Sequence, residues 1–405
     1  MHAVRNPQQQ ARLIVLLGVL VAFGPLSIDM YLPALPAIAA DLAAPVTRIQ
    51  LTIGGFLAGF CGGMLLYGPL SDRYGRRPVL LSGLSLYLAA SLACAAAQTA
   101  EQLIALRVLQ AMGGGAATVM ARAIVRDAFA LSEASHVLTL MQQITMIAPL
   151  LAPLLGGWLL LLAGWRSLFL LLAVIGAICL AVVSLRLPES HPPSGRSDIT
   201  LGKAFRAYGH LLQDLPTMGY SLALGLSFGA MFAYITGSPF VYIQYFGVAA
   251  QHYGYLFGLN IVAIVLFSLL NRRLLPRHAI DTLLQWQCGV VAVAGLLLWL
   301  IGGHSLWLIG GHSLWLTVLP LLFSVGMTGS IGPNAMARLL QLHADRAGAV
   351  MALAVSGQFG CGMLASALVA SLFDGSPRAM CLLVMACGVA AWLSLQLIRF
   401  SRKSS

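Results

Sequence analysis

The chain alternates long apolar runs with short polar stretches along almost its whole length. At about 1.5 Å per residue, each run is long enough as a helix to cross a hydrocarbon layer of about 30 Å. A backbone surrounded by lipid has to satisfy its own hydrogen bonds, which favours helices over irregular chain. We therefore expect twelve membrane-spanning helices, at residues 13–38, 48–68, 79–97, 103–123, 136–162, 165–187, 217–241, 252–271, 280–301, 312–336, 347–372 and 378–400.

One long polar break, from Pro188 to Asp198, separates the first six runs from the last six. We predict an all-α polytopic membrane protein with two six-helix bundles, residues 1–188 and 217–405, joined by a cytoplasmic linker at 189–216. Two halves joined in this way are typical of transporters whose halves rock about a central site.

The composition excludes a soluble globule, because 59% of the 405 residues are hydrophobic and only 9% are charged. The formal net charge is +11, but the basic residues form short clusters between apolar runs, so we expect no nucleic-acid partner. The seven cysteines lie in apolar segments without metal-binding spacing. We expect no metal, no cofactor and no disulfide, and we expect a monomer in the lipid bilayer.

The distribution of basic residues predicts the orientation. If both termini are cytoplasmic, nearly all loop arginines and lysines fall on the cytoplasmic side, as the positive-inside rule requires. The opposite loops then hold little beyond Arg48, Arg166 and Arg378. We therefore predict a multi-pass protein of the bacterial inner membrane with both termini in the cytoplasm.

Asp29 is the only acidic residue that lies centrally in a predicted span. An ionised carboxylate is costly in hydrocarbon and usually has a function there, although Asp29 could instead lie among the headgroups near a segment end. Arg107 in the fourth span lies at about the same depth when helical residues are counted from each face. We expect the two to pair, the alternative being an Arg107 that snorkels to the outer headgroups.

The stretch between the second and third spans, residues 68–78, reads G-P-L-S-D-R-Y-G-R-R-P and combines two glycines with one acid and three arginines. It resembles the loop signature of the major facilitator superfamily, usually written G-x-L-a-D-r-x-G-r-k. The glycines would permit a tight turn, and the acid and arginines would form a charge network that changes between transport states. The resemblance implies a gate loop made of Gly68, Asp72, Arg73, Gly75, Arg76 and Arg77, with Asp127 at the foot of span four as a partner. The corresponding stretch 271–277 keeps the basic charge without the acid, so any latch there should be weaker or different.

Two further stretches are similar to motifs of proton-driven drug exporters in the same superfamily. Residues 107–117 resemble the arginine-bearing motif of the fourth span. Span five resembles the antiporter motif G-P-x-x-G-G at Pro153, Gly156 and Gly157, with Ala152 in place of the first glycine. Small residues here would let helices approach closely, and generic helix contact remains an alternative.

Together with residues 27–36 and 121–127, these motifs make the chain resemble the Bcr/CflA subfamily of twelve-span drug:proton antiporters. The resemblance implies a proton-coupled efflux antiporter that exports amphipathic antibiotics of the bicyclomycin, phenicol or sulfonamide type. Asp29 would be the titrating group and would contact substrate, with Tyr31 and Gln143 as further substrate-binding candidates. The diagnostic motifs lie in the first half, so they do not identify the substrate.

Two other functions are alternatives to this interpretation. An uptake symporter for a small nutrient would share the fold and the gate loop. A membrane-embedded enzyme should show convergent catalytic groups at membrane depth, which the spans lack. The octapeptide Leu298–Ser305 repeats as Leu306–Ser313, and we interpret it as a duplicated loop segment rather than a histidine metal site, because two histidines lack further ligands.

Overall fold

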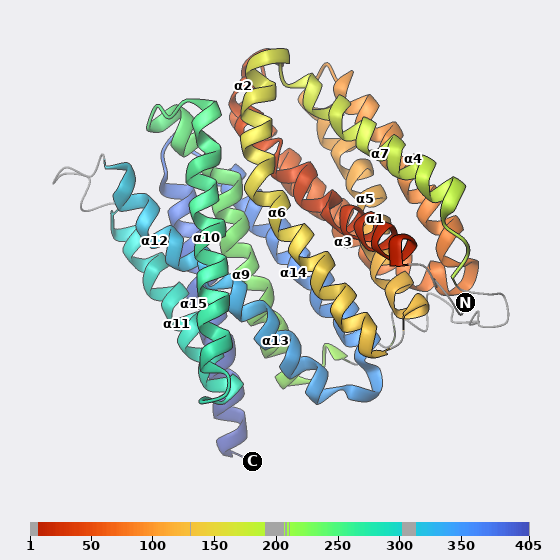
Figure 1. Ribbon diagram of the computed structural model, residues 1–405. Helices are drawn as coiled ribbons and strands as arrows, with labels where there is room; N and C mark the ends of the chain where they lie inside the picture. Colours follow the sequence, from red (N-terminus) through yellow and green to blue (C-terminus); the bar gives the residue numbers. More distant parts are fainter. Residues whose placement is uncertain are drawn as a thin grey trace. The chain divides into compact units, whose positions relative to one another are not determined.

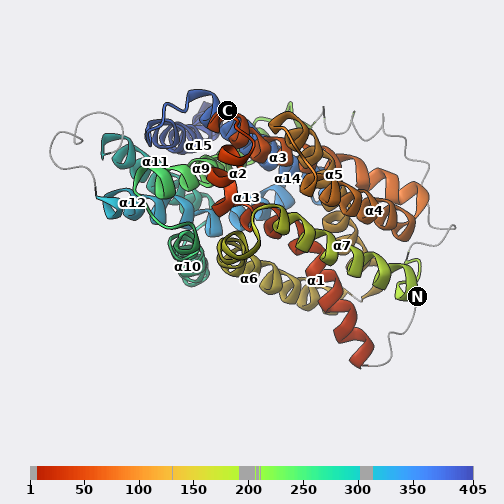
Figure 2. The ribbon, with the colours of Figure 1, turned by 90° about the horizontal axis from the view of Figure 1, so that it is seen from above.

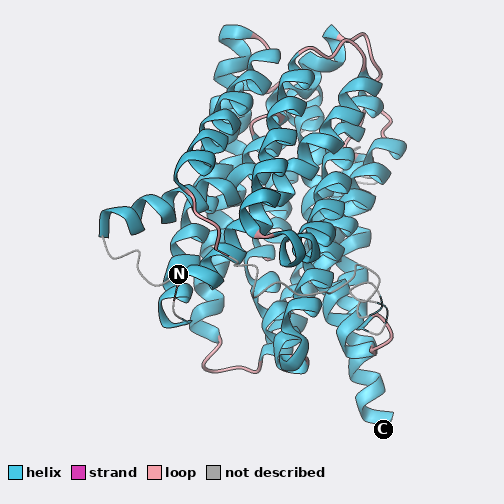
Figure 3. Ribbon diagram, turned by 90° about the vertical axis from the view of Figure 1, so that its right-hand side faces the viewer, coloured by secondary structure: helices cyan, strands magenta, loops and turns pink. Residues whose placement is uncertain are grey.

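The computed structural model describes residues 7–129, 131–190, 206, 209, 211–301 and 313–404. Within these residues the chain is helical and contains no strand (Figure 3). Twelve segments are long and apolar enough to cross a membrane, counting only the described residues. The predicted fold class is confirmed, and the predicted spans agree with these segments to within a few residues at most ends.

The chain forms two compact units, which are described separately. The first comprises Met1–Ala37 and Gly55–Ala204, and the second Ile38–Gly54 and Phe205–Ser405. The helices that supply the first unit are α1 (Pro7–Asp29), η1 (Leu32–Ala34), α3 (Val46–Tyr74), α4 (Arg76–Ala95), α5 (Ala100–Ala128), α6 (Leu131–Ala163) and α7 (Arg166–Arg186). In this unit α1 packs against α5 and α6, and α4 packs against α5 and α7 (Figure 1).

The second unit includes α2 (Leu35–Asp41) apart from its first residues, and α3 as far as Gly54. Its remaining helices are α9 (Leu215–Pro239), η3 (Phe240–Tyr245), α10 (Ala250–Leu274), α11 (Ile280–Trp299), α12 (Leu314–Gly326), α13 (Thr328–Leu342), η6 (Ala344–Arg346), α14 (Ala347–Leu372) and α15 (Arg378–Ser404). Here α9 packs against both α14 and α15, and α11 packs against α15 (Figure 2). Most of the predicted linker and of the octapeptide repeat lies outside the described residues.

The first span is broken in the middle. The α-helix α1 ends at Asp29, a turn follows, and the short helices η1 and α2 complete the crossing. Pro33 lies at the start of η1, where its ring fixes the backbone and disfavours an α-helical residue before it. The break therefore places Asp29 at a helix end inside the span instead of at a membrane surface.

The predicted loop at 68–78 is mostly helix, which corrects the sequence-based interpretation. The helix α3 continues through Tyr74, and Gly75 alone joins it to α4. Gly75 has φ of +100°, a conformation that side chains disfavour, so it provides the tight turn that was expected. Gly68 lies inside α3 and makes no turn. The stretch is polar because the helix α3 extends beyond the hydrocarbon layer. Its polarity does not mean that the helix has ended.

Candidate functional site

Asp29 is buried at the carboxyl end of α1, with 5% of its surface exposed. Within the described part of the chain, its carboxylate forms no ion pair or hydrogen bond. A helix terminus leaves backbone carbonyls without helical partners, so the surroundings of Asp29 are irregular as well as buried. The next residues resume hydrogen bonding through the turn, with the Met30 amide donating to the Leu26 carbonyl at 3.3 Å.

The span-five motif meets this turn directly. Gly156 of α6 lies against the backbone of Met30, the neighbour of Asp29, so closely that a Cβ atom at position 156 would collide with the Met30 carbonyl oxygen. Pro153 and Gly157 are buried in the same helix, and Pro149 and Pro153 both lie within it. The close approach requires glycine at 156. It also gives this motif a physical connection to Asp29.

Arg107 of α5 is completely buried. One guanidinium nitrogen donates to the Gln110 side-chain oxygen at 2.6 Å, and another donates to the Ser27 carbonyl at 3.0 Å. The guanidinium carbon lies 4.3 Å from the ring centre of Phe56 and 4.7 Å from that of Tyr31. Such desolvated cation–π contacts are each worth up to about 2 kcal/mol. Aromatic faces and neutral acceptors thus hold the cation inside the bundle.

The predicted direct pairing of Asp29 with Arg107 is not formed in this structure, among the residues it describes. The depth match holds, because the Ser27 carbonyl that accepts from Arg107 lies two residues before Asp29. The Nε atom of Arg107 has no hydrogen-bond partner in the described residues. The sequence argument paired the two charges because a buried arginine needs compensation, and it overlooked aromatic rings as the source of that compensation.

A chain of hydrogen bonds extends from Arg107 that sequence reasoning missed. The Gln110 amide donates to the Ser91 hydroxyl at 2.8 Å, and Ser91 donates to the Tyr87 carbonyl at 2.7 Å. The Tyr87 and Ser27 hydroxyls lie 2.6 Å apart, which returns the chain to α1. The signal in the sequence was that these polar residues lie inside apolar spans. The chain fixes α1, α4 and α5 around the arginine.

The two further substrate-binding candidates lie in different environments. Tyr31 is only 1% exposed, and its ring is in contact with the Arg107 guanidinium. It therefore forms part of the arginine's aromatic surroundings and offers no open surface in this structure. Gln143 is exposed on α6.

The gate residues come together around Arg76, the first residue of α4. Its guanidinium lies 2.6 Å from the Asp72 carboxylate and 3.0 Å from the Asp127 carboxylate, and it donates to the Ser71 hydroxyl. Arg76 is only 7% exposed. The structure thus brings Asp72, Arg76 and Asp127 into one cluster that connects the ends of α3, α4 and α5.

The other gate arginines behave differently. Arg73 is exposed beside the Tyr74 ring, whereas Arg77 donates to the Ser184 carbonyl at 2.7 Å. Glu189 was not predicted to take part, yet its carboxylate accepts hydrogen bonds from the backbone amides of Arg76 and Arg77 at 2.9 and 3.1 Å. It caps α4 at the end where the helix dipole favours an anion. Glu189 lies at the start of the polar stretch 188–198, where an acidic residue is common in a solvent-exposed linker and gives no sign of a capping role.

Comparisons with known proteins identify the family of the chain. Residues 16–367 match the Major Facilitator Superfamily. The chain belongs to this superfamily. The transporter is 31% identical to "Bicyclomycin resistance protein homolog" of Haemophilus influenzae over 390 residues, which cover 96% of each chain. It is 30% identical to "Multidrug resistance protein D" of Escherichia coli over 392 residues, again 96% of each. An uncharacterized transporter of Bacillus subtilis, YdgK, is 42% identical over 65% of this chain and 66% of its own.

Solved structures confirm the fold. The transporter superposes on the crystal structure of a D-xylose-proton symporter with a TM-score of 0.70 at 18% identity, covering 95% of this chain and 96% of that one. At this identity the likeness concerns the fold alone. Members of this superfamily are transporters rather than enzymes. The twelve candidate spans in the described residues, together with the bacterial relatives, support a multi-pass protein of the inner membrane. Among the described residues, no cluster of His, Cys, Asp or Glu is suited to hold a metal ion.

Proposed function

We propose that this transporter is a proton-coupled multidrug efflux antiporter that exports amphipathic antibiotics of the bicyclomycin, phenicol or sulfonamide type. The observation that carries the proposal is the contact of Gly156, in the antiporter-like motif, with the turn that holds the buried Asp29. The names of the relatives that align with 96% of the chain, bicyclomycin resistance and multidrug resistance, support the substrate class.

Asp29 is the proposed proton carrier. It takes up a proton when it faces outward, and substrate binding together with the nearby positive charge of Arg107 releases that proton when it faces inward. Arg107 acts through the end of α1, because it holds the Ser27 carbonyl two residues from the carboxylate. Asp29, Tyr31 and Gln143 are the proposed substrate contacts. Tyr31 becomes available only if the aromatic surroundings of Arg107 open.

The cluster around Arg76 is the proposed inward gate. The rocking halves are proposed to be residues 1–188 and 217–405, with the linker 189–216 and both termini in the cytoplasm, and the protein works as a monomer. Glu189 then joins the beginning of the linker to the gate. A rearrangement of Asp72, Arg76 and Asp127 would alter the anchoring of the linker at the same time.

The direction of proton flux tests the proposal. Inside-out vesicles with an acidic lumen are exposed to a phenicol, and the lumenal pH is followed with a fluorescent indicator. Exchange predicts that the drug makes the lumen more alkaline, with no such signal from vesicles that lack the transporter. A drug-evoked change of the opposite sign would instead establish symport and would overturn efflux by exchange.

A further inference from the structure

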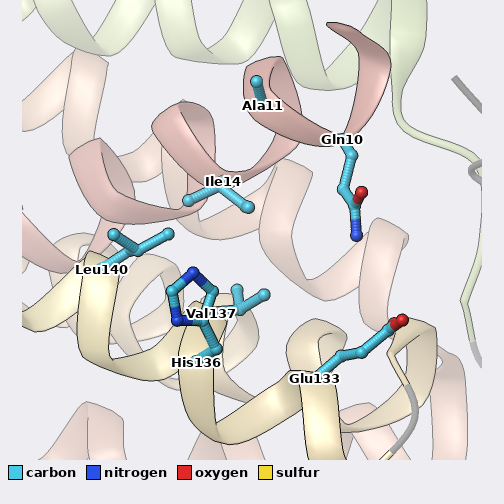
Figure 4. Close-up of a pocket in the computed structure, with 7 residues that line it drawn as sticks. All are labelled: Gln10, Ala11, Ile14, Glu133, His136, Val137 and Leu140. Atoms are coloured by element: carbon cyan, nitrogen blue, oxygen red, sulfur yellow. The ribbon is translucent and has the colours of Figure 1, made fainter. Parts of the chain in front are cut away.

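A cavity of about 510 Å³ opens between the first turns of α1 and of α6 (Figure 4). This volume lies within the range of small-molecule sites, about 300 to 1,000 Å³. The residues that line it are Gln10, Ala11 and Ile14 from α1 and Glu133, His136, Val137 and Leu140 from α6. The membrane-spanning segments of these two helices begin at Gln10 and His136. The cavity therefore lies at a boundary between water and hydrocarbon.

Three polar side chains line the cavity: Gln10, Glu133 and His136. Within the described residues, Gln10, Glu133 and His136 form no hydrogen bond or ion pair. Figure 4 shows the Gln10 amide and the Glu133 carboxylate extending into the same side of the cavity from opposite helices. A carboxylate can only accept hydrogen bonds, whereas an amide and an imidazole can also donate them. The group suits a ligand that carries a cation next to an anion or another acceptor.

The rest of the lining is apolar, and apolar surface continues beyond it. Ile14, Val137 and Leu140 line the cavity toward the hydrocarbon side of the boundary residues. On the same helices Val15 is 56% exposed and Ile147 is 53% exposed. Exposed apolar side chains on a membrane span are normal contacts for lipid chains. A ligand with an apolar tail can thus follow the helix surface into the hydrocarbon.

We propose that this cavity binds a phospholipid that carries a primary amine, with its ammonium on Glu133 and its phosphate near the Gln10 and His136 donors. An acyl chain then lies over Ile14, Val137 and Leu140. We choose a lipid over a drug because the cavity opens at the membrane boundary, where amine-bearing lipid is present at high local concentration. Asp29 lies fifteen residues beyond Ile14, about 22 Å along the helix, so this site is separate from the proposed proton carrier.

The test uses the purified full-length transporter in detergent, with short-chain phosphatidylethanolamine as the probe and thermal stability and native mass spectrometry as readouts. Phosphatidylethanolamine should bind and raise the melting temperature of the wild type. Glu133→Gln should weaken that binding at least 5-fold, since it keeps the shape and removes the charge. Glu101→Gln is the matched control, because Glu101 is an exposed glutamate in the first turn of α5 and lies outside the cavity lining. It should bind like the wild type.

A second variant guards against a misfolded Glu133→Gln protein. Ala11 is exposed and lines the cavity, so Ala11→Phe fills the space without burying a polar group. It should abolish phosphatidylethanolamine binding while the protein elutes as one folded species. Equal binding to the wild type, Glu133→Gln and Ala11→Phe would overturn the proposal, as would equal binding of phosphatidylglycerol, which lacks the amine. Glu133-dependent binding of an amphipathic amine drug but not of the lipid would also overturn it and would make the cavity a drug site.

Discussion

The two units join corresponding helices with different chemistry. In the first unit, buried Arg76 joins Asp72 and Asp127 in a charged cluster. In the second unit the corresponding region of α10 contains Asn271, which exchanges hydrogen bonds with Asn334 and accepts one from Gln287. Asn334 also donates to Gln287, and all four distances lie between 2.8 and 3.1 Å. The amide cluster is neutral and buried. A charged cluster can respond to changes in nearby charge, whereas a neutral one mainly fixes helix positions.

The second unit does contain an ion pair, with the charges exchanged. In the first unit the cation, Arg76, begins the third span and the acid, Asp127, ends the fourth. In the second unit the acid, Asp281, lies in the first turn of α11 and the cation, Arg338, lies near the end of α13. These helices are the third span and the end of the fourth span of that unit. Both members of this pair of reversed polarity lie outside the stretch 271–277, so the weaker or different latch expected in that stretch stays a prediction.

Burial distinguishes the two arrangements energetically. The side chain of Arg76 is 9% exposed and that of Arg338 is 22% exposed. Among the described residues, Arg76 pairs with two carboxylates and Arg338 with one. Removing one partner of a buried pair leaves an uncompensated charge, which is far more costly than loss of a surface pair. We therefore expect the loss of a charged partner to destabilise the protein more in the first unit than in the second.

The largest effect is expected for Arg76→Ala. It should lower the apparent melting temperature of the detergent-solubilised protein by roughly 5 to 10 °C, which corresponds to about 3 kcal/mol. Arg73→Ala removes the same charge from an exposed position in the same stretch and should shift it by less than about 2 °C. Equal shifts for the two variants would show that the cluster around Arg76 is not the stabilising feature.

An intermediate effect is expected for Asn334→Leu. This change leaves the buried side chains of Asn271 and Gln287 without their shared partner, at a cost of about 2 kcal/mol. The melting temperature should fall by roughly 4 to 7 °C. The control is Gln244→Leu, which removes an exposed amide from the same unit. A shift no larger than that of the control would mean that the amide cluster contributes little.

A smaller effect is expected for the reversed pair. Arg338 donates to both carboxylate oxygens of Asp281, at 2.8 and 2.9 Å. A double-mutant cycle with Asp281→Asn and Arg338→Gln should give a coupling of about 1 kcal/mol, because both side chains are partly exposed. Strictly additive losses would rule out a direct interaction between the two side chains in solution.

The smallest effect concerns Asp214, which caps α9 at the same end of the second unit. Partial burial alone would raise its pKa, but hydrogen bonds from the Thr217 hydroxyl and amide, and the nearby His343, hold the pKa below its ordinary value. A lowered pKa adds stability above about pH 4 that is lost as the pH falls through it. Thr217→Val should therefore reduce the loss of melting temperature between pH 6 and pH 3. An unchanged loss would contradict this role of the hydroxyl.

The spans could be predicted because lipid imposes a length and a polarity on every crossing segment. The contact between Arg76 and Asp127 could also be anticipated, since both belong to recognisable motifs. The cap by Glu189 and the pair of Asp281 with Arg338 could not. Their partners are 113 and 57 residues apart and show no shared pattern, so only the folded arrangement reveals them.

Arg107 shows a second limit of prediction. The sequence indicated that a buried arginine needs compensation, and it offered Asp29 as the obvious partner. In this structure two aromatic rings surround the cation instead. Phe56 comes from α3, and Tyr31 directly precedes η1. Such contacts depend on ring orientation, which residue spacing does not encode.

Transport driven by a pH gradient tests the role of Asp29 most directly. The wild type, Asp29→Asn and Asp41→Asn are each reconstituted into proteoliposomes with an acidic lumen. Asp41 is an exposed acid in the same span and serves as the control. The uptake of a labelled phenicol is then measured against external pH. Asp29 as the proton carrier predicts that Asp29→Asn loses gradient-driven uptake by at least 100-fold, whereas Asp41→Asn retains it. An Asp29→Asn protein that transports with the pH dependence of the wild type would contradict the mechanism.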